Sequence, residues 1–565
     1  MDTLSNLLQM EEKWRNEWQE KRAYEAAFPD ERPKRYLLDM FPHPSAAGLS
    51  VAHCRNFVGT DVFARFSRAQ GYNVLYPMGW DAFGITAEKE ARQRGIPPAE
   101  VIREHAAKYQ KQMQRLGLSY DWSRSLNTSD PGYYRWTQWF FQLLYRRGLI
   151  YAESHVRTWC AHCAKVLRAV EVDERERCCR CGRSTSQIIS REWFVRITAY
   201  TAKLDRTLDA LDWPAAMKKM QRHWLSQLRD WSISRRRYWG TPLPLIHCPT
   251  CGVQLAPELP VRLPSLAGGP LPTDLAQVPG FCDTICPQCG EPARRDEHVL
   301  SVMFDSVWHF LRFAVPDSEQ FPFAGEAAAY WMPVDLLVGG TEQTNFGLLY
   351  ARFAGMVLAE AGYLSQTEPF PRFAQQGVVH GHNHQRMTKS KNNVVKIKTL
   401  IDRYGADACR WYLLSLADNG SSIDWKNHDP ALRGAHKWLR RVVYLSQLYP
   451  TPADAVEPPL TLPPDDITLQ FLPLLHEAIT QFHLYHYMVE LMALIKALRR
   501  EAHASRPESW RWAGTLSILL RLLAPVAPHL AEELWQQRGF AGSIHQQPWP
   551  VQAHAIVGNP PHAGL

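Results

Sequence analysis

Short apolar runs alternate with amphipathic stretches through most of the chain. Residues 35–40, 71–78 and 334–340 are apolar runs next to turn-forming residues, a pattern typical of buried strands. Residues 54–66 and 98–116 carry apolar side chains at helical spacing. Strands that alternate with helices predict an α/β fold with a doubly wound parallel sheet, whose ligands bind at the carboxyl ends of the strands.

The last third of the chain has a different pattern. Residues 376–380 are one more strand candidate, and from residue 400 onward the apolar spacing is helical. The proline-rich segment 450–464 indicates a linker. Two long amphipathic stretches, 467–500 and 512–536, predict long helices and favour an all-α bundle at the end of the chain.

Composition narrows the class of protein. A chain of 565 residues is too long for one hydrophobic core, and its 45% hydrophobic and 21% charged residues are ordinary for a globular protein. No apolar run approaches the roughly 18 residues of a membrane span. The helix expected over residues 1–27 carries acids, unlike a secretory signal, so we expect a cytoplasmic protein without membrane contact. The net charge of +8 permits a polyanionic partner without requiring one.

Eight of the twelve cysteines form four Cys-x-x-Cys pairs. In a reducing compartment such pairs are typical of metal sites, because two thiolates on one tight turn supply half of a tetrahedron. Consecutive pairs favour structural zinc over a redox-active or accidental pair. Cys54, Cys179, Cys282 and Cys409 are expected to stay unligated, with Cys179 as an alternative to a neighbouring ligand. The spacing predicts one zinc site at Cys160, Cys163, Cys178 and Cys181, and a second at Cys248, Cys251, Cys286 and Cys289.

Residues 41–53 form a small-residue turn between the first strand and the first helix. Such a turn is a natural phosphate cradle, because free backbone N–H groups and the positive end of the helix dipole face the anion. His53 falls on the first helical turn, and Asp81 follows the next strand. Plain scaffold is an equally good interpretation of the turn. The polar, basic loop 381–393 is either solvated or closes over a nucleotide.

Tryptophans and basic residues are interleaved over residues 217–240, and Arg235, Arg236 and Arg237 directly precede Tyr238 and Trp239. This composition is typical of a nucleic-acid or phosphate surface. A packed arginine–aromatic junction explains it about as well, and the residues leave both interpretations open.

The order of these segments resembles that of the class I aminoacyl-tRNA synthetases, and among them the leucyl-tRNA synthetases. The resemblance implies a split Rossmann-like catalytic domain with two zinc-binding insertions, followed by an all-α bundle of the anticodon-binding kind. It also implies a ligase that makes an aminoacyl-adenylate from a leucine-like amino acid and ATP with Mg²⁺, and passes the acyl group to tRNA. The similar blocks are residues 41–57, 71–84, 159–163, 192–224, 229–252, 331–342, 386–407 and 522–550.

Two signatures carry the resemblance. Residues 50–53 stand where the family has HIGH, whose last histidine, here His53, contacts ATP phosphate. Residues 386–390 stand where it has KMSKS, whose second lysine, here Lys389, neutralises the departing pyrophosphate. By resemblance, Asp81 anchors the substrate ammonium. The resemblance assigns catalysis to Ser50, His53, Lys389 and Ser390, ATP binding to Ala52, His53, Gly340, Glu342, Arg386, Met387 and Lys389, and amino-acid binding to Met40, Phe41, His43 and Asp81.

The chain departs from the family pattern inside both signatures. Ser50 replaces the first histidine of HIGH, Ala52 replaces its glycine, and Arg386 replaces the first lysine of KMSKS. His43 stands where leucyl enzymes usually carry a tyrosine beside the amino-acid pocket. These departures predict a paralogue or a minimal form of the enzyme.

Two family domains have no counterpart in the sequence. Arg229 follows almost directly after Trp224, where the family inserts a large editing domain, and no tRNA-elbow domain follows residue 550. We expect a monomer with these segments: 1–156, the first half of the catalytic domain with an N-terminal helix; 157–190, the first zinc module; 191–228, a connective segment; 229–385, the second half of the catalytic domain, including a second zinc module at 246–292; 386–430, the KMSKS-like loop and stem-contact region; 431–550, the helical bundle; and 551–565, a tail.

Three functions stay open at this point. The first is aminoacylation of tRNA with leucine or a related aliphatic amino acid, without editing. The second keeps activation but passes the acyl group to a small molecule or carrier protein in a biosynthetic pathway. The third is a non-catalytic RNA-binding or regulatory protein, against which the presence of His53, Asp81 and Lys389 argues. Residues 431–565 hold 11 Lys and Arg against 10 Asp and Glu, so the bundle is less basic than a phosphate-tracking surface.

Overall fold

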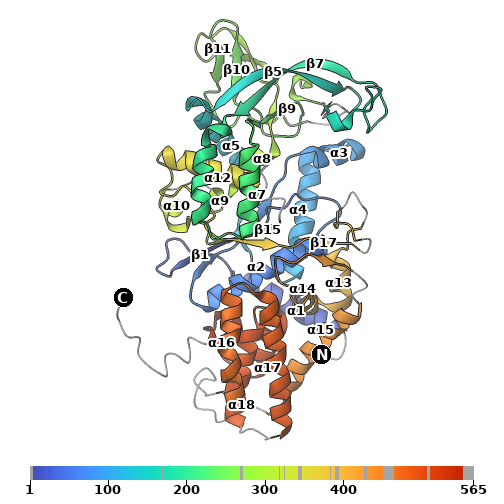
Figure 1. Cartoon of the computed structure of the whole chain (residues 1–565), viewed down its shortest axis with the longest axis vertical. Helices are drawn as coiled ribbons and strands as arrows, with labels where there is room; N and C mark the ends of the chain where they lie inside the picture. Colours follow the sequence, from blue (N-terminus) through green and yellow to red (C-terminus); the bar gives the residue numbers. More distant parts are fainter. Residues whose placement is uncertain are drawn as a thin grey trace.

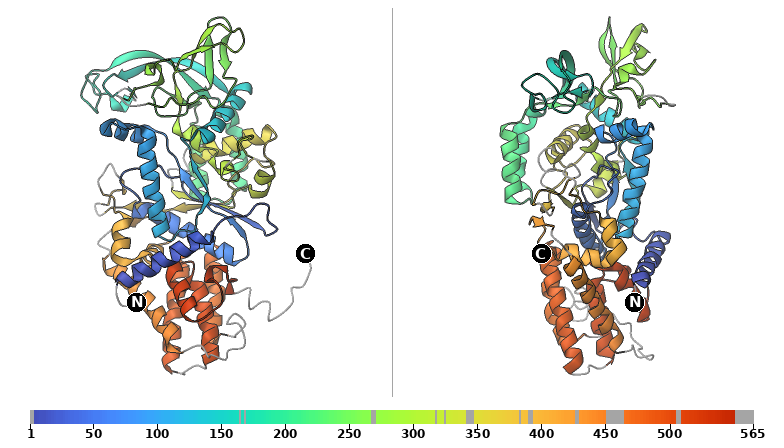
Figure 2. Two further views of the ribbon diagram at one scale, coloured as in Figure 1. Left: turned by 180° about the vertical axis from the view of Figure 1, so that it is seen from behind. Right: turned by 90° about the vertical axis from the view of Figure 1, so that its right-hand side faces the viewer.

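The molecule is elongated, with β-ribbons at one end, a parallel sheet in the middle and a helical bundle at the other end (Figures 1 and 2). The N-terminal helix α1 (Leu4–Glu20) packs against the bundle helix α19 (Pro528–Gln537). No described helix is long and apolar enough to cross a lipid bilayer. The computed structural model describes residues 4–163, 165–167, 169–266, 271–316, 318–323, 325–340, 347–381, 384–388, 393–425, 429–449, 464–504 and 509–550.

A four-stranded sheet occupies the centre, and all of its strand pairs are parallel. A further strand, β3, follows β2 after one residue and pairs in parallel with β4. The predicted parallel sheet is therefore confirmed. The strands of the central sheet are, in spatial order, β16 (Phe373–Gln376), β15 (Leu336–Gly340), β1 (Lys34–Leu38) and β2 (Asn73–Leu75), and the additional pair is β3 (Pro77–Trp80) with β4 (Asp121–Asn127).

Both faces of the sheet are buried, because successive side chains of a strand point into different cores. Leu37 and Val338 pack in the core that contains α2 (Val51–Ala69), whereas Leu38 and Leu337 pack in the core that contains α12 (Gly347–Glu360). A strand buried on both sides is apolar at every position, which explains the uninterrupted runs. The other helices of this part are α3 (Ile85–Arg94), α4 (Pro98–Arg115), α5 (Pro131–Arg146), α8 (Val302–Ser306), α9 (His309–Arg312) and α10 (Gly325–Trp331).

The two cysteine modules project as β-ribbons at the top of Figure 1. In the first, two long strands, β5 and β7, pair antiparallel from Ile150–Val195 to Trp159–Ser186. The second is a four-stranded antiparallel sheet. The elements are β5 (Ile150–Cys160), β6 (Lys165–Val166), β7 (Ser186–Val195), α6 (Thr201–Thr207), α7 (Ala215–Ser226), β8 (Trp231–Ser232), β9 (Ser234–Arg235), β10 (Leu245–Cys248), β11 (Gly252–Leu255), β12 (Asp283–Ile285), β13 (Pro292–Arg295) and β14 (Val299–Leu300).

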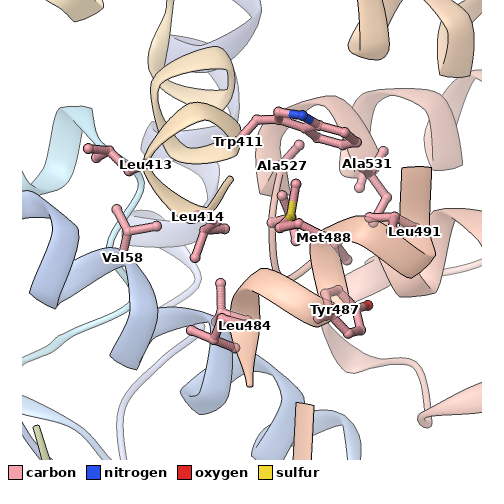
Figure 3. Close-up of a cluster of buried hydrophobic side chains, with 14 of the residues drawn as sticks. Val58, Trp411, Leu413, Leu414, Leu484, Tyr487, Met488, Leu491, Ala527 and Ala531 are labelled. Carbon is pink, nitrogen blue, oxygen red and sulfur yellow. The ribbon is translucent and has the colours of Figure 1, made fainter. Parts of the chain in front are cut away.

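Helices make up the end of the chain, and their core is continuous with that of the sheet. Val58 of α2 and Leu414 of α14 meet Leu484 and Met488 of α17 in one buried cluster (Figure 3). The elements are β17 (Val379–His380), α13 (Ile397–Tyr404), α14 (Ala406–Leu414), β18 (Ile423–Asp424), α15 (Asp429–Leu448), α16 (Asp466–Thr480), α17 (Leu484–Ala504) and α18 (Ser509–Leu523), with α19 last.

Several predicted boundaries are wrong. The two long helices are each broken: Phe482 takes a left-handed conformation, φ 63°, between α16 and α17, and Pro525 and Pro528 interrupt the chain between α18 and α19. The strand expected over 376–380 splits at Gly377, where a Cβ would lie 2.0 Å from the Ser421 carbonyl oxygen. The N-terminal helix ends at Glu20 rather than at residue 27.

Candidate active site

The turn between β1 and α2 has one conformation fixed by a glycine. Gly48 has φ 73°, and a Cβ there would lie 2.9 Å from the side-chain amide of Gln112. That amide oxygen accepts a hydrogen bond from the Leu49 N–H at 2.7 Å. Glycine is the residue that adopts this φ readily and leaves room for the Gln112 side chain. The turn that it forms leads the chain from the carboxyl end of β1 into α2.

Ser50 is the N-cap of α2, and it forms a reciprocal capping box with His53. The Ser50 hydroxyl oxygen accepts a hydrogen bond from the His53 N–H at 3.4 Å and lies 2.7 Å from His53 Nδ1. The Ser50 N–H donates to the same nitrogen at 3.3 Å. Ala52 is half-buried in the same turn. The three residues assigned to the first signature therefore share one helical turn.

The segment after the basic loop pairs directly with this turn. The Val51 N–H donates to the Val395 carbonyl at 3.0 Å, and the Ile397 N–H donates to the Leu49 carbonyl at 3.2 Å. These bonds join residues 49–51 to residues 395–397 as a short antiparallel bridge. The segment that follows the second signature therefore lies beside the first, more than 300 positions away in the sequence.

Asn393 fastens the two arms of the basic loop together. Its side-chain oxygen accepts a hydrogen bond from the Thr388 N–H at 2.8 Å, and its amide donates to the carbonyls of Gln385 and Arg386 at 3.2 and 3.1 Å. Met387 is buried beside them, and burial lowers the pKa of Arg386. Arg386 and Met387 therefore belong to a fixed stem.

Three assigned residues, Glu342, Lys389 and Ser390, lie outside the described residues. Gly340 is the last residue of β15, and its strand partner across the sheet is Gln376 of β16. β15 pairs with β1 on its other side, so Gly340 ends at the same sheet edge as the 41–53 turn.

Asp81 lies against the beginning of the 41–53 turn, where its N–H donates to the Pro42 carbonyl at 3.0 Å. The Asp81 carboxyl is enclosed, and its Oδ1 has no hydrogen-bond partner among the described residues. Burial raises the pKa of this carboxyl to about 8. Ser306 donates a hydrogen bond to this carboxyl, and the remaining oxygen is a suitable site for a cation, because an ammonium group would restore the ionised form.

The His43 ring contacts Asp81, and two further rings stack nearby on the same turn and on α9. The His43 Nδ1–H donates to the Asp81 backbone carbonyl at 2.6 Å. The Phe41 ring stacks on His309, with centroids 4.5 Å apart and planes 4° from parallel. Burial lowers the pKa of His309 to about 4, so this ring is neutral at pH 7. Met40 is half-buried next to Phe41. Of the predicted amino-acid-binding residues, the structure thus brings His43 into contact with Asp81, and Met40 and Phe41 precede it on the same turn.

A second enclosed carboxyl, Asp305, lies behind this cluster on α8. One of its oxygens accepts a hydrogen bond from the Thr241 hydroxyl at 2.7 Å, and the other has no partner among the described residues. Burial and the neighbouring Asp81 raise the pKa of Asp305 well above its usual value. This residue had no signal in the sequence, because a buried acid on a short helix has no motif.

The eight paired cysteines form two tetrads. In each tetrad the sulfur atoms lie within 4.8 Å of one another. The Cys160–Cys181, Cys163–Cys178 and Cys248–Cys289 sulfurs are separated by 3.5, 3.9 and 3.6 Å. A tetrahedral zinc with Zn–S bonds of about 2.3 Å requires sulfurs roughly 3.8 Å apart, whereas a disulfide requires about 2.0 Å. The donor sets therefore fit zinc.

An arginine-lined cavity of about 1120 Å³ separates the first cysteine module from α3 and β9. Arg92 pairs with Glu88 at 3.0 Å, Arg157 with Glu192 at 2.9 Å, and Arg236 with Asp274 at 3.1 Å. Arg235 and Arg237 form no ion pair with a described residue, and burial lowers the pKa of both. The arginines that line the cavity are Arg92, Arg157, Arg180, Arg235, Arg236 and Arg237.

The interleaved arginines and aromatic residues divide into two roles. Tyr238 and Trp239 are buried, and the Trp239 indole N–H donates to the Ala82 carbonyl at 3.0 Å. Tyr238 and Trp239 thus form a packed junction, whereas Arg235, Arg236 and Arg237 line the cavity. A second cavity of about 630 Å³ also contains Arg235 and Arg237 and extends to Met303, close to Asp305.

Two residues that fix the site were missed in the sequence. Arg55, on α2, donates to the carbonyls of Asp418 and Ser421 at 2.9 Å each and so ties the helix to the loop before β18. Asn393 fastens the basic loop as described above. Both act on backbone carbonyls far away in the sequence, so no local pattern reveals them.

Comparisons with known proteins agree with this geometry. The family described as tRNA synthetases class I (I, L, M and V) matches residues 13–426, and the anticodon-binding domain of tRNA ligase matches residues 475–560. The leucine–tRNA ligase of Thermotoga maritima is 29% identical over 96% of this chain and 90% of its own length. That of Synechococcus elongatus is 28% identical over 96% and 89%.

Solved structures give the same result. A LeuRS of Agrobacterium radiobacter K84, in a ternary complex with tRNA and LeuAMS, superposes with a TM-score of 0.83 and 26% identity over 96% of this chain and 89% of that one. A methionyl-tRNA synthetase of Mycobacterium tuberculosis shares the fold, with a TM-score of 0.64 and 20% identity over 93% and 96%. The chain belongs to the class I tRNA synthetases of the I, L, M and V group, and within it is similar to leucyl enzymes along 96% of its length.

Proposed function

We propose that this protein activates leucine or a related aliphatic amino acid with ATP and transfers it to the 3′ end of tRNA. The proposal rests on one observation above all. Asp81, the capped His53 turn and residues 395–397 after the basic loop all contact the turn that follows β1, at the carboxyl edge of the central parallel sheet. That edge is where such sheets bind nucleotides and substrates.

In this mechanism the amino-acid carboxylate attacks the α-phosphorus of ATP, and the bond to pyrophosphate breaks. Asp81 holds the ammonium, and the packing of Phe41 and His43 around it orients the carboxylate. His53 and Lys389 face the charge that develops on the phosphates. A ribose hydroxyl of the acceptor then attacks the acyl carbon, and AMP leaves. Little covalent help is required, because positioning and positive charge supply most of the rate.

Pyrophosphate exchange with a panel of amino acids tests the activation step. We expect exchange that depends on leucine or a close aliphatic relative and is lost in Asp81→Asn. Exchange with none of the panel, in a folded protein that contains its metal, would contradict the proposal. Incubation of the protein with ATP, the amino acid and a total tRNA pool tests the acceptor. The measured quantity is the acyl group attached to tRNA, which we expect to appear.

The arginine-lined cavity supports tRNA as the acceptor. Its position between the first cysteine module and Arg235 allows phosphates of an incoming strand to contact guanidinium groups. Because Arg236 is held by Asp274, the sharper test uses Arg235→Gln with Arg237→Gln. We expect these changes to weaken tRNA binding and flatten its salt dependence. The control is Arg222→Gln, at an exposed pair with Asp205 outside the cavity.

We further propose that the protein does not edit. In support of this, α7 ends at Ser226 and β8 begins at Trp231. The alignment with the Thermotoga maritima enzyme extends over 753 positions, so long stretches of that relative face gaps in this chain. A pocket alone rejects a side chain one methylene smaller by only about 1–3 kcal/mol, so mischarged tRNA should persist. Rapid hydrolysis of mischarged tRNA by the purified protein would refute this.

A further inference from the structure

Ser50 occupies an unusual position for a residue of the first signature, because it caps the helix that carries His53. It makes three contacts with that residue: the hydroxyl oxygen accepts from the His53 N–H, the hydroxyl meets His53 Nδ1 at 2.7 Å, and the Ser50 N–H meets Nδ1 at 3.3 Å. Ser50 is itself buried and bridged to Lys396, after the basic loop.

These contacts determine which ring nitrogen carries the proton. A backbone N–H can only donate, so the His53 Nδ1 that it meets must offer its lone pair. The Ser50 hydroxyl then points its own proton at the same nitrogen while its oxygen accepts from the His53 N–H. The neutral ring therefore carries its proton on Nε2.

We propose that Ser50 is a positioning residue that holds His53 in the Nε2–H form, so that the ring donates a hydrogen bond to a phosphate oxygen of ATP. This inference rests on the proposed function of the site. In the opposite tautomer, Nε2 would present a lone pair to the anion. A freely rotating ring would not keep its N–H directed at the phosphate oxygen. Serine suits this role because one hydroxyl accepts from the helix and donates to the ring at the same time.

Substitutions at position 50 separate this role from helix capping. Glycine is nearly as good as serine at an N-cap, whereas alanine is much poorer. A purely structural Ser50 therefore predicts near-normal activity in Ser50→Gly and a loss only in Ser50→Ala. The proposal predicts that both lose kcat for pyrophosphate exchange by about 10–100-fold, the usual effect of removing the partner that orients a functional histidine. The KM for the amino acid should change little, and Ser50→Thr, which keeps the hydroxyl, should rescue the rate.

The tautomer itself is measured on protein with ¹⁵N-labelled histidine, by long-range ¹H–¹⁵N spectra, with His53→Gln to assign the resonance. We expect the Nε2–H form in the wild-type protein and a mixture in Ser50→Gly. A wild-type Nδ1–H form, or unchanged kcat and tautomer in Ser50→Gly, would overturn the inference. Thermal unfolding of each variant identifies any loss that is due to misfolding.

This test remains distinct from that of the proposed function. If the wild-type protein exchanges pyrophosphate with no amino acid, the proposed function fails, while the spectra still decide whether Ser50 sets the ring. If exchange is normal and Ser50→Gly is as fast as wild type, only the inference about Ser50 fails.

Discussion

At the scale of single residues, the site contains buried carboxyl groups, which are costly to bury, and uncharged aromatic rings near them. Asp81 and Asp305 are enclosed carboxyls, each with one oxygen that lacks a partner among the described residues. Uncompensated buried carboxyls reduce stability, so natural proteins retain them mainly where a ligand completes them. The His43 ring bonds to the Asp81 backbone and adds no charge to its carboxyl, so we propose that the ammonium of a substrate supplies the missing charge.

The first prediction concerns Asp81→Asn. A carboxyl whose folded pKa is about 8 stabilises the fold least at high pH, because the unfolded chain ionises from about pH 4 while the folded chain resists until pH 8. The neutral variant should therefore unfold at the same temperature as wild type near pH 4, and on the order of 1–3 °C higher near pH 8. It should also lose the thermal shift that the amino-acid substrate gives. Asp205→Asn, at an exposed position, should show no such pH trend. A variant less stable than wild type at pH 8 would contradict the argument.

The second prediction concerns the two side chains proposed to face the ATP phosphates, Lys389 and His53. Lys389→Ala and His53→Ala should lower the rate of adenylate formation by about 10²–10³-fold, because their contacts strengthen only as charge develops on the leaving pyrophosphate. Amino-acid affinity, measured separately, should be nearly unchanged. Lys391→Ala, two positions along the same basic loop, is the matched control. Normal turnover in both variants would place the chemistry elsewhere.

At the scale of elements, the fold brings distant segments together by backbone pairing. The 49–51 turn is bridged to residues 395–397, Asn393 closes the loop stem, and Arg55 ties α2 to the loop before β18. Each of these contacts uses backbone carbonyls or N–H groups as partners, so it fixes geometry whatever the side chains around it are.

The cysteine modules are the opposite case. Their ribbons have small cores of their own, and a metal is the natural substitute for a core.

The third prediction concerns these modules. The purified protein should contain two zinc ions per chain, one in each tetrad. The double variant Cys163→Ser with Cys181→Ser should keep one zinc and lose tRNA charging more than pyrophosphate exchange, because this module forms one wall of the arginine-lined cavity. The matched variant Cys251→Ser with Cys289→Ser should also keep one zinc. Metal content well below one zinc per chain in the unmodified protein would rule out the sites.

At the scale of the whole molecule, a buried ionic junction joins the sheet to the bundle. Asp61 of α2 accepts hydrogen bonds from Arg65 at 2.9 Å and from Arg410 of α14 at 2.6 Å, and all three side chains are buried. Arg410 continues to the carbonyls of Pro525 and Val526 in the bundle. The apolar cluster of Figure 3 lies along the same junction. The bundle is therefore built as a continuation of the catalytic half.

The fourth prediction tests this junction with Asp61→Asn. The change leaves two buried guanidinium groups without their carboxylate, which costs about 3–5 kcal/mol. The Asp61 pKa lies below its usual value because both arginines favour its charged form. The ionised Asp61 carboxyl therefore makes its full contribution to the stability of the fold above about pH 4, and this contribution declines as the pH falls further. Urea unfolding at pH 7 measures the loss, and Asp205→Asn, in an exposed pair with Arg222, should cost no more than about 0.5–1 kcal/mol. A similar loss of unfolding free energy in both variants would mean that the buried junction contributes no more to stability than an exposed ion pair.

The sequence by itself determined what local pattern can encode. Apolar runs buried on both faces gave the parallel sheet, cysteine spacing gave both tetrads, and the small-residue turn before α2 gave the position of His53. Pro525 and Pro528 were a local signal for the second break that the periodicity overrode, whereas the left-handed Phe482 between α16 and α17 has no local signal. Only the tertiary structure decided that Asp305 lies close to Asp81, that Asn393 and Arg55 hold distant carbonyls, and that arginines from four stretches of the chain share one cavity. Such contacts join residues that are far apart in the sequence, many of them by more than a hundred positions. The periodicity of apolar residues reports only local structure, so it cannot predict these contacts.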